Sequence, residues 1–67
     1  MEEVVSLEEI LLQEAVDRGK EVTIFLKSGY QMDAVIIDFD CNVLLCRVKG
    51  EKQMIYISAV STIVLGF

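Results

Sequence analysis

Apolar residues along this chain follow two different spacings, and the change between them falls near Glu21. Before that point they recur every three or four residues, at Leu7, Ile10, Leu11 and Ala15. This spacing places them on one face of a helix, so we predict an amphipathic helix over residues 7–18.

Capping signals mark both ends of this predicted helix. Ser6 precedes it, where a hydroxyl accepts hydrogen bonds from free backbone N–H groups, and Glu9 three residues later completes a capping box. Gly19 predicts the C-terminal end, because glycine readily adopts the left-handed conformation common there.

From Glu21 the spacing changes to two, where Val22, Ile24 and Leu26 alternate with the residues between them, and short apolar runs follow at residues 34–37 and 43–46. Both patterns predict β-strands. Turn-forming residues divide the segment at Ser28-Gly29, at Asp40-Cys41-Asn42 and at Gly50-Glu51-Lys52, while the last two strands meet at Ser58-Ala59. The five predicted strands span residues 21–27, 30–39, 43–49, 53–57 and 59–65.

The predicted fold class is mainly β with an N-terminal helix, as one domain over residues 1–67. Five short, strongly bent antiparallel strands favour a small barrel. A chain of this length buries only about 60% of its unfolded surface, yet 54% of its residues are hydrophobic. We therefore expect subunits to associate. The apolar last strand would pair with a neighbouring subunit, and head-to-tail repetition would close a ring.

The composition of the chain limits the kinds of ligand, metal site and activity that it can have. The net charge of −5 argues against generic nucleic-acid binding, which depends on Lys and Arg neutralising phosphates. The chain has no His and only two cysteines, Cys41 and Cys46, so we expect no metal site, no cofactor and no disulfide framework. Asp38 and Asp40 alone are weak evidence for acid–base catalysis, and we expect no enzyme. The apolar runs are too short to span a membrane, so we expect a cytoplasmic protein.

Several segments together resemble the Hfq family of bacterial Sm-like RNA chaperones, over nearly the whole chain from Ser6 to Val64. They are the helix, Val22-Thr23-Ile24-Phe25-Leu26, Gly29, Phe39-Asp40, Gln53-Met54-Ile55-Tyr56 and Ala59-Val60-Ser61-Thr62. The resemblance implies an Sm fold, a homohexameric ring and a role in post-transcriptional regulation. It also implies single-stranded RNA binding on two faces, called distal and proximal, and on a rim.

The resemblance carries most of an adenine-binding distal site onto this chain. Tyr30 offers a flat ring, and Gln53 both donates and accepts hydrogen bonds. Asp33 departs from the family pattern, which usually has a neutral or basic residue at this position. Its carboxylate could accept an adenine amino group but would repel phosphate. A role for Phe25 and Tyr30 as packing aromatics stays open. The implied distal residues are Phe25, Leu26, Lys27, Gly29, Tyr30, Gln31, Met32, Gln53 and Thr62.

The proximal and rim positions match the family less well. The family's proximal uridine site has its aromatic and its Lys-His pair where this chain has Asn42 and Ile57-Ser58, so we expect little U-rich binding there. The rim positions Arg18 and Lys20 also suit the negative end of a helix. The implied proximal residues are Glu8, Cys41, Asn42, Ile57 and Ser58.

Two further residues are expected to be structural: Asp40 as an acceptor of backbone N–H groups in its turn, and Tyr56 at a subunit contact. An alternative function is a ring that acts as a protein-interaction or scaffold module with little RNA binding. Its basic partner would meet the acidic helix surface formed by Glu2, Glu3, Glu8, Glu9 and Glu14.

Overall fold

The N-terminal helix of the computed structural model, which describes residues 6–67, has the predicted bounds. Helix α1 spans Leu7–Arg18. The Ser6 hydroxyl accepts a hydrogen bond from the Glu9 N–H at 3.1 Å and donates one to the Glu9 carboxylate at 3.2 Å. The reciprocal bond of the capping box therefore joins two side chains. Gly19 ends the helix in the left-handed conformation and donates its N–H to the Ala15 carbonyl at 3.1 Å.

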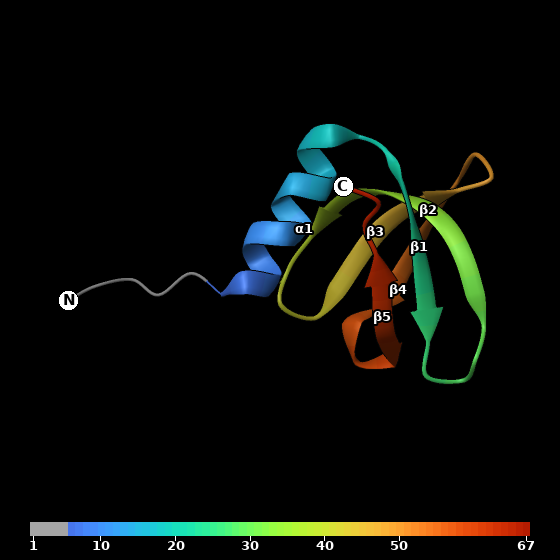
Figure 1. Cartoon of the computed structure of the whole chain (residues 1–67). Coiled ribbons are helices and arrows are strands. Elements are labelled where there is room, and N and C mark those ends of the chain that lie inside the picture. Colours follow the sequence, from blue (N-terminus) through green and yellow to red (C-terminus); the bar gives the residue numbers. More distant parts are fainter. Residues whose placement is uncertain (1–5) are drawn as a thin grey trace.

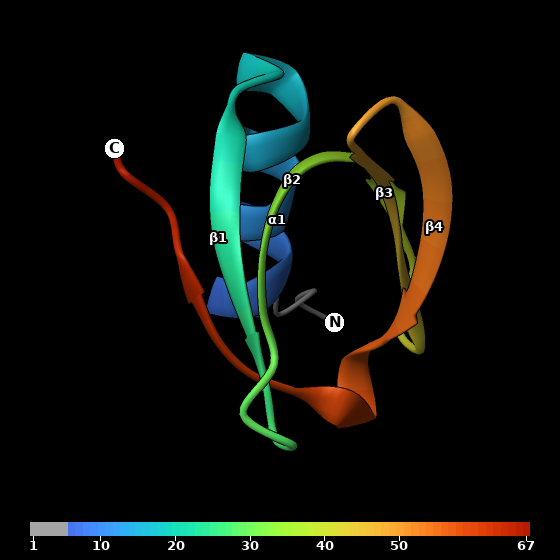
Figure 2. The same cartoon turned by 90° about the vertical axis from the view of Figure 1, so that its right-hand side faces the viewer.

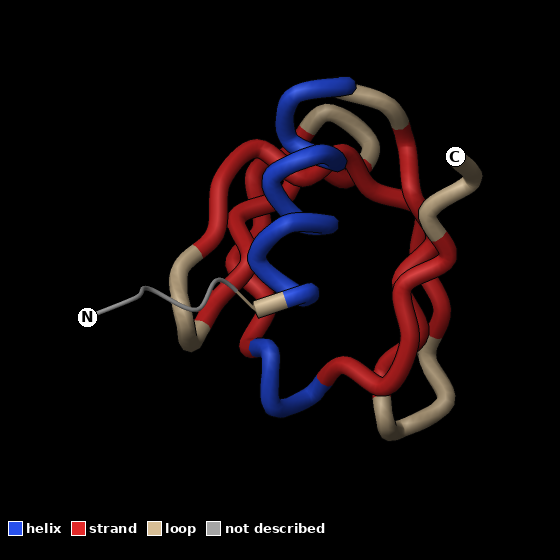
Figure 3. Tube along the Cα trace, turned by 60° about the vertical axis from the view of Figure 1, so that its left-hand side comes forward, coloured by secondary structure: helices blue, strands red, loops and turns tan. Residues whose placement is uncertain are grey.

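The predicted apolar face of the helix was partly wrong. Leu12 and Ala15 are buried and Val16 packs against the core, whereas Leu7 is 70% exposed and Ile10 is 51% exposed. Apolar residues extend around more than half of the helix, so spacing alone did not single out the face that packs against the sheet. Figure 3 shows the helix lying across one side of the strands.

Five antiparallel strands form one strongly bent sheet, as predicted (Figure 1). The sheet is not closed, because its order is β4-β3-β2-β1-β5 and the outermost strands β4 and β5 do not pair (Figure 2). The strands are β1 Glu21–Leu26, β2 Gln31–Phe39, β3 Val43–Val48, β4 Glu51–Tyr56 and β5 Val60–Val64.

Strand boundaries near the C-terminus differ from those predicted. The third turn is Lys49-Gly50 rather than residues 50–52, so β3 ends and β4 begins earlier than expected. Lys49 and Gly50 have φ angles of 51° and 83°, typical of the tight two-residue turn that matches strand twist. A 3₁₀ turn over Ile57–Ala59 replaces the direct junction at Ser58-Ala59, because the chain must cross from one edge of the sheet to the other.

The core lies between the bent sheet and α1. Alternating residues of the strands point inward to meet Leu12 and Ala15 of the helix. An irregularity in the β2–β3 pairing between Ile36 and Asp38 adds bend to the longest strand. The buried strand residues are Val22, Ile24, Ala34, Ile36, Leu44, Cys46, Val48 and Ile55.

The two cysteines occupy different environments, and neither forms a disulfide. Burial raises the pKa of the Cys46 thiol to about 11, so this group stays protonated at neutral pH and packs as a small apolar side chain. Cys41 is exposed in the turn between β2 and β3. Over residues 6–67, no helix is long and apolar enough to cross a membrane.

Candidate nucleic-acid interface

Three of the predicted distal residues lie in one row across the outer face of the sheet. Phe25 of β1 is directly opposite Gln31 of β2 on one side and Thr62 of β5 on the other. Residues opposite each other in antiparallel strands share a face, so the three side chains are neighbours. The Ser61 hydroxyl donates to the Phe25 carbonyl at 3.2 Å, which fixes β5 in this register.

A second set of distal residues lies on the opposite, core-facing side of the strands. Met32 is opposite the buried Ile24, and Gln53 is opposite the buried Cys46. Leu26 donates its backbone N–H to the Tyr30 carbonyl at 2.8 Å across the turn that contains Gly29. A single chain therefore does not gather all the predicted distal residues on one face.

A groove of about 460 Å³ begins at the turn between β1 and β2 and reaches the hairpin of β3 and β4. The Tyr30 side chain at its border is 62% exposed. The sequence did not predict that Glu21, Val48 and Lys49 belong to this groove. Strand pairing brings them there, and no local sequence pattern indicates it. The groove, called the Tyr30 groove below, is lined by Glu21, Tyr30, Gln31, Met32, Asp33, Val48 and Lys49.

Asp33 is held by a cross-strand hydrogen bond at the wall of the Tyr30 groove. Its carboxylate accepts the Thr23 hydroxyl at 2.9 Å, and the two residues are directly opposite each other on β1 and β2. Because a carboxylate oxygen accepts more than one hydrogen bond, Asp33 retains acceptor capacity toward the groove.

The predicted proximal positions do come together, but with different chemistry from the family pattern. Ile57 donates its backbone N–H to the Asn42 carbonyl at 2.9 Å and packs against the core. Glu8 shares one cavity of about 240 Å³ with Ile57 and a second cleft with Cys41. The first cavity is walled mainly by apolar side chains, and Thr62 borders it as well. None of these five predicted positions carries an aromatic ring or a cation, although Phe39 lines the cleft that Glu8 shares with Cys41.

The turn between β2 and β3 is organised by Asp40. Its carboxylate accepts the backbone N–H groups of Asn42 at 2.7 Å and Val43 at 2.9 Å. These bonds to the charged form, the Asn42 bond foremost, hold the pKa of Asp40 below its ordinary value of 3.8. Asp40 thus sets the position of Cys41 and Asn42 beside α1.

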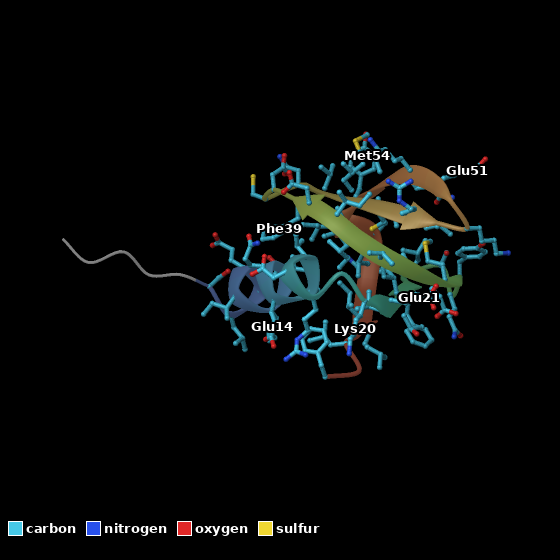
Figure 4. The ribbon with its side chains drawn as sticks, turned by 90° about the horizontal axis from the view of Figure 1, so that it is seen from above. Glu14, Lys20, Glu21, Phe39, Glu51 and Met54 are labelled. Carbon is cyan, nitrogen blue, oxygen red and sulfur yellow. The ribbon has the colours of Figure 1, made fainter. Side chains whose placement is uncertain are left out.

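The rim arginine is already engaged within the chain. The Arg18 guanidinium donates two hydrogen bonds to Glu14, at 2.9 and 2.8 Å, and lies 4.4 Å from the centroid of the Phe67 ring. The ion pair with Glu14 neutralises the charge of Arg18 within the chain. Lys20 follows in the connection to β1 and is exposed (Figure 4).

A capped helix on a bent, open five-stranded antiparallel sheet places the chain in the Sm-like class. The sequence matches the Hfq protein family over residues 7–66, and the chain belongs to this family. The RNA-binding protein Hfq of Natranaerobius thermophilus is 44% identical over 62 residues, which cover 92% of this chain and 74% of that protein. The Hfq of a Geobacillus species is 36% identical, with 92% and 84% covered.

A crystal structure of the pleiotropic translational regulator Hfq matches this structure with a TM-score of 0.85 at 30% identity. The match covers 88% of this chain and 98% of that one. The family resemblance and the fold class predicted from sequence are thereby confirmed. Membership also confirms that the chain is not an enzyme, since the family is one of binding proteins.

Replacing Asp40 with Asn tests the charge in the β2–β3 turn. The lowered pKa of Asp40 contributes stability that is fully present above the unfolded-state pKa near 3.8 and is lost as the pH falls through the lower folded-state value. Asn keeps an acceptor oxygen but does not titrate. The urea unfolding midpoint of Asp40→Asn should therefore fall less than that of the original chain between about pH 5 and about pH 2. Identical acid profiles would contradict this role.

Proposed function

We propose that this chain binds A-rich single-stranded RNA along the Tyr30 groove and acts in post-transcriptional regulation. The observation that carries the proposal is the exposed Tyr30 ring beside Gln31 and Met32 in one groove. Stacking on aromatic side chains is how proteins commonly hold single-stranded bases. The curated relatives are named RNA-binding proteins, which supports the same class of ligand. We place the protein in the cytoplasm, where its two free thiols would stay reduced.

The polar groups of the groove can recognise adenine. Adenine presents an amino donor next to a ring acceptor, and the amide of Gln31 can pair with both. The remaining acceptor capacity of Asp33 suits the same amino group. The proximal positions offer no aromatic ring for stacking, since Ile57 is aliphatic and Asn42 has no ring.

We propose in addition that the chain forms a homohexameric ring through the free edges of its two outermost strands, β4 and β5. Each protomer leaves β4 on one edge of the sheet and β5 on the other. These edges also expose large apolar side chains, with Met54 58%, Tyr56 57% and Val64 51% exposed. Pairing β5 of one protomer with β4 of the next would satisfy both edges, and such head-to-tail contacts close into rings. The count of six follows the family resemblance.

Tyr30→Ala should weaken binding of a labelled A-rich oligonucleotide by about 1–3 kcal/mol, because the stacking surface is removed. Fluorescence anisotropy measures this, and Tyr30→Phe is the matched control that keeps the ring. U-rich and duplex RNA should bind the original chain more weakly than A-rich RNA does. Equally negligible binding of all three would refute the RNA proposal, and a U-rich preference would place the site on the proximal side.

Tyr56→Ala should reduce the mass of the assembly measured by light scattering, because Tyr56 lies on β4, the outermost strand at one edge of the sheet. Tyr30→Ala is the matched control, since Tyr30 is exposed to a similar degree, 62% against 57%, but lies outside the edge strands. It should leave the mass unchanged. A stable monomer of the original chain would rule out the ring.

A groove on the helix favours a second candidate function, the binding of a basic protein partner. This helix groove, of about 480 Å³, places the half-exposed Ile10 beside Phe39 at the end of β2 (Figure 4). Glu9, Glu14 and Asp17 surround it, and Arg18 compensates Glu14 only. An apolar centre with an acidic border suits a basic segment that carries an apolar anchor. Of the predicted acidic surface, Glu2 and Glu3 lie outside the described residues.

Ile10→Lys separates the two candidate functions. The variant should lose any partner captured at the helix groove from nuclease-treated lysate, while RNA binding is retained. Leu7→Lys is the matched control, since Leu7 is also exposed on α1 but does not line the groove. Partners that disappear on nuclease treatment alone, or that bind both variants equally, would exclude the helix groove as a docking site.

A further inference from the structure

The positive charge of this acidic chain is concentrated in one hairpin. Three of its six Lys and Arg residues, Arg47, Lys49 and Lys52, lie within the hairpin formed by β3 and β4. Glu51 is the only carboxylate in residues 43–56, so this hairpin has a net charge of +2 in a chain of −5. We call it the basic hairpin.

Two of these cations are forced into direct proximity by the strand register. Arg47 on β3 is directly opposite Lys52 on β4. Cys46 and Val48, on either side of Arg47, are buried, so Arg47 and Lys52 both point to the outer face. Like charges at opposite positions of antiparallel strands destabilise the pair. A bound anion would relieve this repulsion.

No carboxylate among residues 6–67 forms an ion pair with Arg47, Lys49 or Lys52. Arg47 is also opposite Val35 of β2, which is opposite Glu21 of β1, so Glu21 lies two strands away. At the usual strand spacing the backbones of Arg47 and Glu21 are roughly 10 Å apart. Asp38 shares the same face, next to Leu45 in the following row. The ion pair found among residues 6–67 joins Arg18 to Glu14, and none involves the basic hairpin.

The basic hairpin also borders the proposed base-binding surface. Lys49, at its turn, lines the Tyr30 groove together with Gln31 and Met32, and the carboxylates Glu21 and Asp33 line it as well. Figure 4 shows Glu51 and Met54 of this hairpin on the opposite side of the molecule from Glu14 on the helix. The unpaired cations are thus next to the groove and separated from the acidic helix. If β4 pairs with another subunit, backbone groups in the plane of the sheet make that contact, and the Arg47 and Lys52 side chains remain free.

We propose that Arg47, Lys49 and Lys52 bind the phosphates of an RNA strand whose bases occupy the Tyr30 groove. This inference rests on the proposed RNA binding and names the groups that make it possible for so acidic a chain. It assigns the readout of bases to the groove and the electrostatic attraction to the hairpin.

The salt dependence of binding tests this division of roles. For single strands the slope of log affinity against log salt is about −0.7 per neutralised phosphate. The double variant Arg47→Gln/Lys52→Gln should therefore have a slope shallower by about 1.4 for oligo(A). The ratio of the affinity of the original chain to that of this variant should therefore fall about 7-fold between roughly 50 and 200 mM salt. Anisotropy titrations of the full chain measure this, and Glu51→Gln should change affinity in the opposite direction and tighten binding.

The matched control is Arg18→Gln/Lys20→Gln, which also removes one arginine and one lysine. A larger reduction of the slope in the hairpin variant than in this rim variant supports the inference. Equal effects of the two double variants, or no effect of the hairpin variant, would overturn it while leaving RNA binding intact. Negligible oligo(A) binding by the original chain would overturn the proposed function and the hairpin inference together. Unfolding curves confirm that each variant is folded.

Discussion

The pairing of β1 with β5 is the contact on which the rest of this structure depends. It joins strands from opposite ends of the chain and places β1 between β2 and β5. The Ser61 hydroxyl on the Phe25 carbonyl and the Lys27 N–H on the Ala59 carbonyl, at 3.2 and 2.8 Å, secure this junction. Because β5 leaves β4 to reach β1, the sheet encloses a core without closing. The same step that completes the hydrophobic core therefore leaves two edges with unsatisfied backbone groups.

Local chemistry made much of this fold predictable. Ser6 and Gly19 delimit the helix as their capping preferences require, and Asp40 makes the turn contacts expected of an Asx residue. What depends on distant contacts was not predictable. The choice of Leu12 rather than Leu7 for the core follows from how α1 packs on β2, and helical spacing fits both residues. Lys49 joined Tyr30 in one groove only through the pairing of three strands.

The binding chemistry is divided between two sides of a very small molecule. Four carboxylates lie on the helix, whereas three of the six cations lie on the hairpin beside the Tyr30 groove, which also carries Glu21 and Asp33. Net charge alone therefore gives a misleading picture of ligand preference, because a screened field acts over roughly 10 Å at moderate salt. A polyanion near the hairpin experiences mainly the local positive charge, and the same polyanion near the helix is repelled.

Lys49 shows a conflict between folding and charge at a single position. Its backbone φ of 51° lies in the left-handed region, which is unfavourable by roughly 1–2 kcal/mol for most residues with a side chain. Asparagine or glycine would fit this turn with less strain. Either would also remove one of the three cations of the hairpin. Selection for thermal stability alone would thus favour a less strained turn with a weaker positive field, so an engineered, more stable variant would attract a phosphate backbone less strongly.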